Sequence, residues 1–146
     1  MSGRVSETTM TPRASGFELE LAAETDNVPL VRHALRGLLE ASGVAEERIS
    51  DITLAVTEAC ANAVLHAYPD ANGQFEASAD LSTAGELVVT VRDHGSGMAP
   101  RVDSPGLGVG LPVMAAIADA LEIDTPEGAG TVVRMTFNVA ATTAPS

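Results

Sequence analysis

Apolar residues recur at two spacings along this chain, every second residue in some segments and every third or fourth in others. The two-residue period predicts half-buried strands at 17–23 and 74–81. Residues 87–93 are more continuously apolar and follow a short turn, so they predict a hairpin with 74–81. Further strands are expected at 121–124 and 131–139.

The helical spacing predicts three helices. Asp26 or Asn27 can cap the first helix, which ends at Gly43. Ser50 can cap a second helix that ends before Pro69.

A third helix is expected at 111–121. Hairpins combined with helices favour an α+β two-layer sandwich, in which a mixed, mostly antiparallel sheet is covered on one face by helices. The order of elements does not alternate as in a doubly wound fold. We expect residues 1–15 to form a flexible polar arm, residues 16–140 to form one domain, and residues 141–146 to form a disordered tail.

Composition narrows the possible functions. The chain has 20 acidic and 8 basic residues, a net charge of −12, which disfavours nucleic acid and anionic membranes as partners. Every basic residue is an arginine, and the missing lysine excludes phosphate-loop NTPases, eukaryotic-type protein kinases and Schiff-base chemistry. No apolar run approaches the ~20 residues of a membrane span, so a cytoplasmic protein is expected.

The second predicted helix carries two polar residues in apolar surroundings. Glu58 and Asn62 are four residues apart and therefore share one helix face. They could lie on a helix edge that faces water. Alternatively, the Asn62 amide oxygen could bind a hard cation, and Glu58 could act as a base or through a water molecule. Cys60, in the same helix, is expected to be a small core residue.

A strand end carries the next candidate site. Asp93 begins the pattern D-x-G-x-G, with Gly95 and Gly97. This pattern is common in turns that leave a sheet. It would also suit a planar base such as adenine, because the carboxylate can accept a hydrogen bond from an exocyclic amine and the glycines allow close approach.

Two further glycine clusters follow. Gly106, Gly108 and Gly110 precede the third predicted helix, where backbone amides and the helix dipole favour phosphate. The cluster lacks the last glycine of the dinucleotide-binding pattern. A G-x-G-T sequence at 128–131 precedes the last strand and is typical of a hairpin turn.

In this order and spacing, the motifs resemble those of the GHKL or Bergerat-fold ATPases, a superfamily that includes histidine-kinase catalytic domains. The resemblance covers about residues 17–139. The segment 57–68 reads TEACANAVLHAY and is similar to the anti-sigma-factor serine kinase branch, which typically reads S/T-E-A-x-x-N-A-x-x-H-x-Y.

The resemblance implies roles for particular residues in binding ATP and Mg²⁺. Asn62 would coordinate the metal, and Glu58 would be the general base or would orient the nucleophile. The remaining ATP contacts would come from Asp93, Gly95, Gly97 and Thr131 on the adenine side, and from Gly106, Gly108 and Gly110 on the phosphate side. Arg101 is a candidate for the γ-phosphate, because it is the only cation between the two glycine motifs.

The resemblance also implies an activity. The expected function is an ATP-dependent protein serine/threonine kinase that doubles as an anti-sigma factor. It would bind a sigma factor and phosphorylate an anti-anti-sigma protein of the STAS type. Because the segment 98–105 is short where relatives carry a longer lid over ATP, a non-catalytic ATP-binding regulatory module is the alternative. The clustered glycines disfavour a nucleotide-free structural domain. Family members are often homodimers, which is a further expectation here.

Overall fold

The computed structural model describes residues 8–13, 15–67, 73–94, 107–125 and 130–139. Its strands are β1 (Thr9–Arg13), β2 (Gly16–Ala22), β3 (Gln74–Leu81), β4 (Glu86–Asp93), β5 (Ala120–Asp124) and β6 (Thr131–Asn138). Its helices are the 3-10 turn η1 (Thr25–Asn27), α1 (Val28–Ala41), α2 (Glu46–Ala67) and α3 (Leu107–Ile117).

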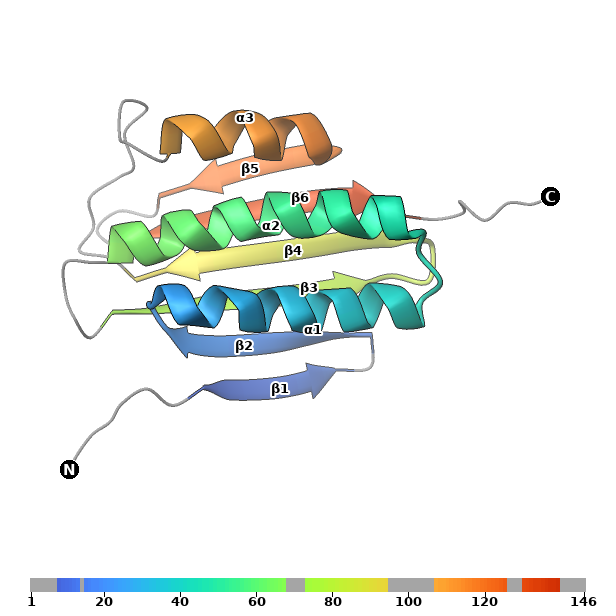
Figure 1. The fold of residues 1–146 in the computed structure, drawn as a ribbon, viewed down its shortest axis with the longest axis horizontal. Helices are drawn as coiled ribbons and strands as arrows, with labels where there is room; N and C mark the ends of the chain where they lie inside the picture. Colours follow the sequence, from blue (N-terminus) through green and yellow to red (C-terminus); the bar gives the residue numbers. More distant parts are fainter. Residues whose placement is uncertain (1–7, 14, 68–72, 95–106, 126–129, 140–146) are drawn as a thin grey trace.

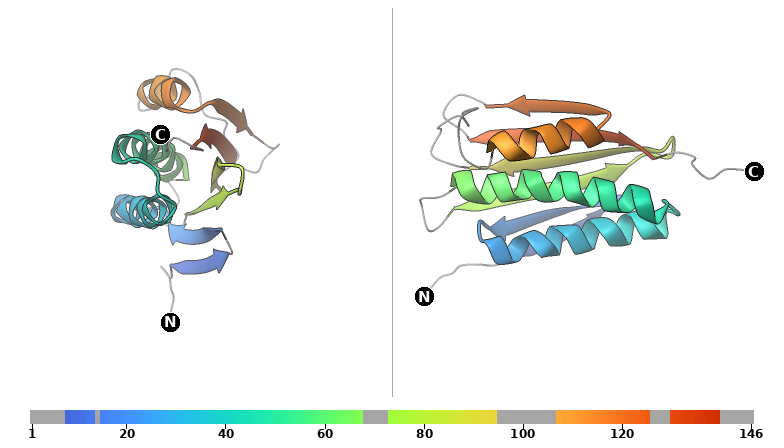
Figure 2. Two further views of the ribbon diagram at one scale, coloured as in Figure 1. Left: turned by 90° about the vertical axis from the view of Figure 1, so that its right-hand side faces the viewer. Right: turned by 45° about the horizontal axis from the view of Figure 1, so that its top comes forward.

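The strands form one open sheet in the order β1-β2-β3-β4-β6-β5, and each neighbouring pair is antiparallel. The three α-helices lie side by side over one face of this sheet (Figures 1 and 2). The predicted α+β two-layer sandwich is therefore confirmed. The sheet was predicted to be mixed and mostly antiparallel, and its described pairings are all antiparallel, because strands that follow one another in sequence mostly pair directly.

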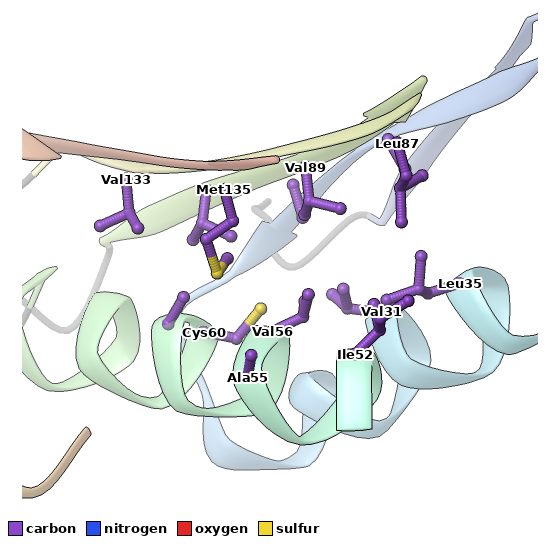
Figure 3. Packing of buried hydrophobic residues seen from close by; sticks show 14 of the residues in the cluster. Val31, Leu35, Ile52, Ala55, Val56, Cys60, Leu87, Val89, Val133 and Met135 are labelled. Atoms are coloured by element: carbon purple, nitrogen blue, oxygen red, sulfur yellow. The ribbon is translucent and has the colours of Figure 1, made fainter. Parts of the chain in front are cut away.

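The core fills the space between the sheet and the helices. Inward residues alternate along each central strand, so Leu87, Val89 and Val91 of β4 are buried while the residues between them face outward. The helices meet these strands with Leu35 of α1 and with Val56 of α2, among others (Figure 3). Each such fully buried side chain contributes roughly 1.5–3 kcal/mol of transfer free energy.

The first helix is close to its prediction. Asn27 is the N-cap residue of α1, although its side chain bonds to the carbonyl of Ala22 (2.8 Å) rather than capping the helix. Past the C-terminus of α1, Gly43 has a φ of +79°, a conformation that favours glycine.

The predicted start of the second helix was wrong. α2 begins at Glu46, and Ser50 lies inside its first turns, where its hydroxyl donates to Glu46 (3.4 Å). Glu46 and Glu47 in the first turn favour this earlier start, because negative charge is stabilised at a helix N-terminus. The Arg36 guanidinium also lowers the pKa of Glu46 by hydrogen bonding.

Two other boundaries differ from prediction. Thr9–Arg13, expected within a flexible arm, forms β1 and pairs with β2, so that part of the arm assignment was wrong. Its Pro12 is compatible with an edge strand, where one side of the backbone has no partner strand. α3 runs from Leu107 to Ile117 rather than over 111–121, and Pro112 lies within it. Packing of α3 on α2 therefore overrides the low helix propensity of Gly108, Gly110 and Pro112.

A polar junction joins α2, β5 and β6 at the end of the domain where α2 begins. Arg48 donates to the Asp119 carboxylate and to the carbonyl of Asn138, both at 3.2 Å. The Asn138 backbone amide donates to the same carboxylate at 2.6 Å. The junction holds the connection between α3 and β5 against the start of α2.

Candidate functional site

Glu58 and Asn62 lie in the C-terminal half of α2, beside the stripe that packs on the sheet. Ile52, Val56 and Ala59 form part of that stripe and are almost fully buried. Asn62 is 8% exposed, although it is polar, and Glu58 is half-buried. A simple water-facing helix edge is therefore wrong for Asn62.

The Asn62 side-chain amide nitrogen is buried without a hydrogen-bond partner among the described residues. Burying an unpaired polar group costs about 1–3 kcal/mol, so such groups in proteins usually meet a ligand or water. Rotation of the carboxamide by 180° exchanges its nitrogen and oxygen, so this position can present either a donor or a metal-binding oxygen.

The first turn of α3 covers these two side chains. A Cβ placed on Gly110 would lie 3.2 Å from the Asn62 amide nitrogen and 3.2 Å from Glu58 Oε1. Gly110 is therefore a glycine because its backbone approaches both side chains closely. Gly108 lies one residue after the start of the same helix. The structure thus brings the phosphate-type glycine motif against the Glu58–Asn62 pair.

Asp93 and Thr131, two of the predicted site residues, lie at the ends of inner strands of the sheet, near the C-terminal half of α2. Asp93 ends β4, Thr131 begins β6, and the two are direct partners in the antiparallel register. Both are buried, at 5% and 6% exposed. The Thr131 hydroxyl has no hydrogen-bond partner among the described residues.

Gly130 packs directly on Asp93, a contact that the sequence analysis did not identify. Its φ is +83°, and a Cβ at this position would overlap the Asp93 carbonyl oxygen and lie 3.0 Å from its carboxylate. The sequence signal was the second glycine of G-x-G-T, which was interpreted as a hairpin turn. That interpretation agrees with the antiparallel pairing of β5 with β6, and glycine at 130 also lets the start of β6 lie against the backbone of Asp93.

Four structural elements bring these residues to one end of the domain. The C-terminal half of α2, the end of β4, the start of β6 and the start of α3 lie at the same end in Figure 1. α2 packs against α3, β4 and β6. Gly95, Gly97, Arg101 and Gly106, which were predicted to belong to the site, lie outside the described residues.

A groove of about 720 Å³ lies between α1 and α2, and both Glu58 and Asn62 line it. Val28, Pro29, Ala61 and Leu65 give it a mostly apolar lining. Arg32, on α1, also lines the groove. The sequence analysis missed this feature, because the residues come from two helices whose relative placement depends on tertiary packing.

Cys60 does not belong to the reactive part of the site. It is fully buried on the sheet side of α2 (Figure 3). Burial raises the pKa of its thiol from 9.0 to about 12, so the group stays protonated and unreactive at neutral pH. Its prediction as a core residue is confirmed.

The buried Asn62 side chain is of a kind that fits the protein's part in binding a magnesium-bound nucleotide. Within the described residues, no group of three or more His, Cys, Asp or Glu side chains could hold a metal ion. Mg²⁺ is commonly bound by one or two protein oxygens together with phosphate oxygens and water, and Asn62 could supply one of these. The orphaned amide and the close approach of Gly110 are compatible with such a ligand.

Comparison with known proteins agrees with this geometry. A family model described as a histidine kinase-like ATPase domain matches residues 21–137, which include Glu58, Asn62, Asp93 and Thr131. The chain belongs to this family. The resemblance inferred from the E-x-x-x-N helix and the glycine motifs is thus confirmed for the histidine kinase-like ATPase domain.

One named relative matches most of the chain, and another matches a shorter part of it. An anti-sigma F factor of Thermoanaerobacter sp. (strain X514) is 30% identical over 131 residues, covering 82% of this chain and 91% of the relative. The serine-protein kinase RsbW of Bacillus velezensis (strain DSM 23117 / BGSC 10A6 / LMG 26770 / FZB42) is 43% identical over 56 residues, which cover 38% of this chain and 35% of that protein.

A solved structure has the same fold. The RsbU and RsbW domains of Rv1364c from Mycobacterium tuberculosis match with a TM-score of 0.69 and 27% identity over 88% of this chain. The match spans 32% of that longer chain. In the part of the present chain that the structure describes, no helix has the length and apolar character needed to cross a bilayer.

Proposed function

We propose that this histidine kinase-like ATPase domain is an anti-sigma factor with protein serine kinase activity. It would bind Mg-ATP, transfer the γ-phosphoryl group to a serine of an anti-anti-sigma protein, and bind a sigma factor. The observation that carries the proposal is the placement of Glu58 beside the orphaned Asn62 amide, under the glycine-containing turn of α3.

Asn62 and α3 would bind the phosphate end of the nucleotide. The first four backbone N–H groups of a helix have no partner within the helix and attract anions, and Gly108 and Gly110 let them approach closely. Asn62 would hold Mg²⁺ through its amide oxygen. When bound, the ion would neutralise charge on the phosphate oxygens.

Asp93 and Thr131 would bind the adenine end. The Asp93 carboxylate can accept a hydrogen bond from the exocyclic amine, and the buried Thr131 hydroxyl can bond to a ring nitrogen or a bridging water. Gly130 would fix the position of Asp93 by packing on its backbone, since a Cβ at this position would overlap the Asp93 carbonyl oxygen.

Glu58 would act on the acceptor serine. Its carboxylate would take the hydroxyl proton while the serine oxygen forms a bond to the γ-phosphorus, and the bond from that phosphorus to the ADP oxygen would break. The groove between α1 and α2 is lined by Glu58 together with Asn62. It would admit an apolar acceptor segment, with Arg32 available to pair with an acidic residue.

The test separates binding from transfer. Wild-type protein and a Glu58→Gln variant would be incubated with labelled Mg-ATP and the anti-anti-sigma proteins encoded in the same genome. We expect Glu58→Gln to bind Mg-ATP normally by calorimetry and to lose at least about 100-fold in phosphotransfer, within the range for removing a general base. Glu47→Gln makes the same chemical change near the exposed start of α2 and should alter neither quantity.

Each result has a defined meaning. Full phosphotransfer by Glu58→Gln would contradict the role of Glu58. If the wild-type protein bound Mg-ATP tightly but never yielded a phosphoprotein, the non-catalytic ATP-binding module would be the better description. If calorimetry detected no Mg-ATP binding at all, both functions would be wrong.

A further inference from the structure

The position of α3 depends on contacts with its neighbours, because its own sequence favours a helix poorly. Gly108, Gly110 and Pro112 all lie within its 11 residues, and glycine and proline have the lowest helix propensities. An isolated helix of this length is marginal in water. Among its described side chains only Met114 is fully buried. The place where α3 lies over the candidate nucleotide site must therefore be set by what holds its ends.

The two ends of α3 contact opposite halves of α2. Near the start of α3, Gly110 lies against Glu58 and Asn62 in the C-terminal half of α2. Just beyond the end of α3, Asp119 pairs with Arg48 near the start of α2. α3 therefore runs antiparallel to α2 and is held to it near both ends (Figure 1). A shift of α3 along α2 would move Gly110 relative to the Glu58–Asn62 pair.

Asp119 anchors the chain as it leaves α3. Its backbone N–H donates to the carbonyl of Thr136 on β6 (2.8 Å). Its carboxylate accepts from the Asn138 backbone N–H (2.6 Å) and from Arg48 (3.2 Å). Hydrogen bonds to an ionised group are stronger than those between neutral groups. Asp119 lies only two residues after the last residue of α3, so the anchor restricts the helix directly.

The candidate site tolerates little displacement of α3. A Cβ on Gly110 would already lie 3.2 Å from the Asn62 amide nitrogen and from Glu58 Oε1, so the backbone is about as close as a glycine allows. Movement toward α2 would push these side chains aside. Movement away would separate the first turn of α3 from phosphate oxygens beside Asn62, because N–H···O hydrogen bonds need donor–acceptor distances of about 2.7–3.2 Å.

We propose that Asp119 is a positioning residue of the nucleotide site and that it acts through α3. By fastening the end of α3 to β6 and to the start of α2, Asp119 holds the first turn of α3 against the Glu58–Asn62 pair. The phosphate end of the nucleotide would bind there. This inference rests on the nucleotide binding of the proposed function, and it does not depend on phosphotransfer.

Asp119→Ala tests this role, with Glu122→Ala as the matched control. Glu122 lies on the neighbouring β5 and is also an exposed carboxylate paired with an arginine, Arg134, at 3.6 Å. We expect Asp119→Ala to raise the Kd for Mg-ATP in calorimetry at least about 5-fold, the lower end of the usual coupling between separate sites. The Kd for adenosine, measured by NMR titration, should stay unchanged because adenosine has no phosphates to meet α3. Glu122→Ala should change neither Kd.

Two further measurements separate positioning from a general loss of stability. In the protein without nucleotide, amide hydrogen exchange of Leu111 and Val113 should accelerate in Asp119→Ala and not in Glu122→Ala, because only the first substitution releases α3. When Asp119→Ala is combined with Gly110→Ala, the Kd for Mg-ATP should rise by less than the product of the two single effects, because both act on the same contact. Asp119→Asn keeps an acceptor and loses the charge, so its effects should be smaller and in the same direction.

The outcomes distinguish this inference from the proposed function. The role of Asp119 is overturned if Asp119→Ala binds Mg-ATP as tightly as Glu122→Ala, or if it weakens adenosine and Mg-ATP equally. A wild-type protein that binds Mg-ATP and transfers no phosphate would overturn the kinase activity alone, and the response of Asp119→Ala would still decide its positioning role. A wild-type protein that binds no Mg-ATP would overturn both.

Discussion

Replacing Gly110 by alanine tests whether the first turn of α3 and the Glu58–Asn62 pair form one nucleotide site. The added methyl group would lie 3.2 Å from both Asn62 Nδ2 and Glu58 Oε1, and 3.5 Å from Glu58 Cβ. Contacts this short force a shift of a few tenths of an ångström, so at least one of the two side chains must move.

Two opposing effects act on stability. Alanine in place of glycine inside a helix gains about 1 kcal/mol, because glycine loses more backbone entropy on folding. Inserting a methyl group into a packed site typically costs about 1–3 kcal/mol. We therefore expect the free energy of unfolding to fall by no more than about 2 kcal/mol.

Gly110→Ala should weaken the binding of Mg-ATP more clearly than it lowers the free energy of unfolding. A hydrogen bond or metal contact to a charged group contributes about 1.5–3 kcal/mol, and displacing Asn62 would lose part of it. The Kd for Mg-ATP should therefore rise at least about 10-fold, which corresponds to about 1.4 kcal/mol. Isothermal titration calorimetry measures this Kd directly, and denaturant unfolding of the free protein measures stability in parallel.

Gly37→Ala provides a matched control. Gly37 lies inside α1, and a Cβ there would meet nothing within 4 Å. This variant should gain about 1 kcal/mol in stability from helix propensity and bind Mg-ATP as the wild type does. If Gly110→Ala also kept the wild-type Kd, the inferred contact between α3 and the ligand-binding side chains would be refuted.

Three further variants test the proposed adenine end of the site and the core. Thr131→Val removes a buried hydroxyl that has no partner among the described residues, so the free energy of unfolding should stay unchanged or rise by up to about 1 kcal/mol in denaturant unfolding. The Kd for ATP should rise. The control Thr136→Val, on the other face of β6, should leave the Kd unchanged. Gly130→Ala should lower the free energy of unfolding by at least about 2 kcal/mol, because of its positive φ and the overlap with Asp93, and a wild-type melting curve would contradict this. Burial raises the pKa of Cys60 from 9.0 in the unfolded chain to about 12 in the folded protein. The protonated thiol therefore contributes fully to the free energy of unfolding below pH 9.0, and this contribution is lost as pH rises toward 12. Between those limits, wild-type stability should fall relative to Cys60→Ala by about 1.4 kcal/mol per pH unit in urea titrations, and parallel pH profiles would contradict this cause.

The sequence could predict the site residues that depend on local spacing. Glu58 and Asn62 share a face because both lie on one strongly patterned helix, and Asp93 ends a strand whose apolar residues are unmistakable. These assignments need only helix rotation and strand alternation.

The parts that depend on packing could not be predicted. α3 starts at Leu107, four residues before the predicted start, and this start depends on packing against α2. Gly110 then lies in the first turn of α3, close to Glu58. The groove beside Arg32 lies between α1 and α2, and its shape depends on how these two helices pack against each other. β1 is short, contains proline, and forms only because β2 offers it a free edge.

The order of strands has a consequence for how the chain folds. β3 and β4 are joined by a tight turn, whereas β2 ends at Ala22 and its neighbour β3 begins at Gln74, with α1 and α2 between them. Closing that long loop costs entropy before any β2–β3 contact can repay it. The β3–β4 hairpin with α2 should therefore form early, and substitutions in β2 should mainly accelerate unfolding while leaving the folding rate nearly unchanged.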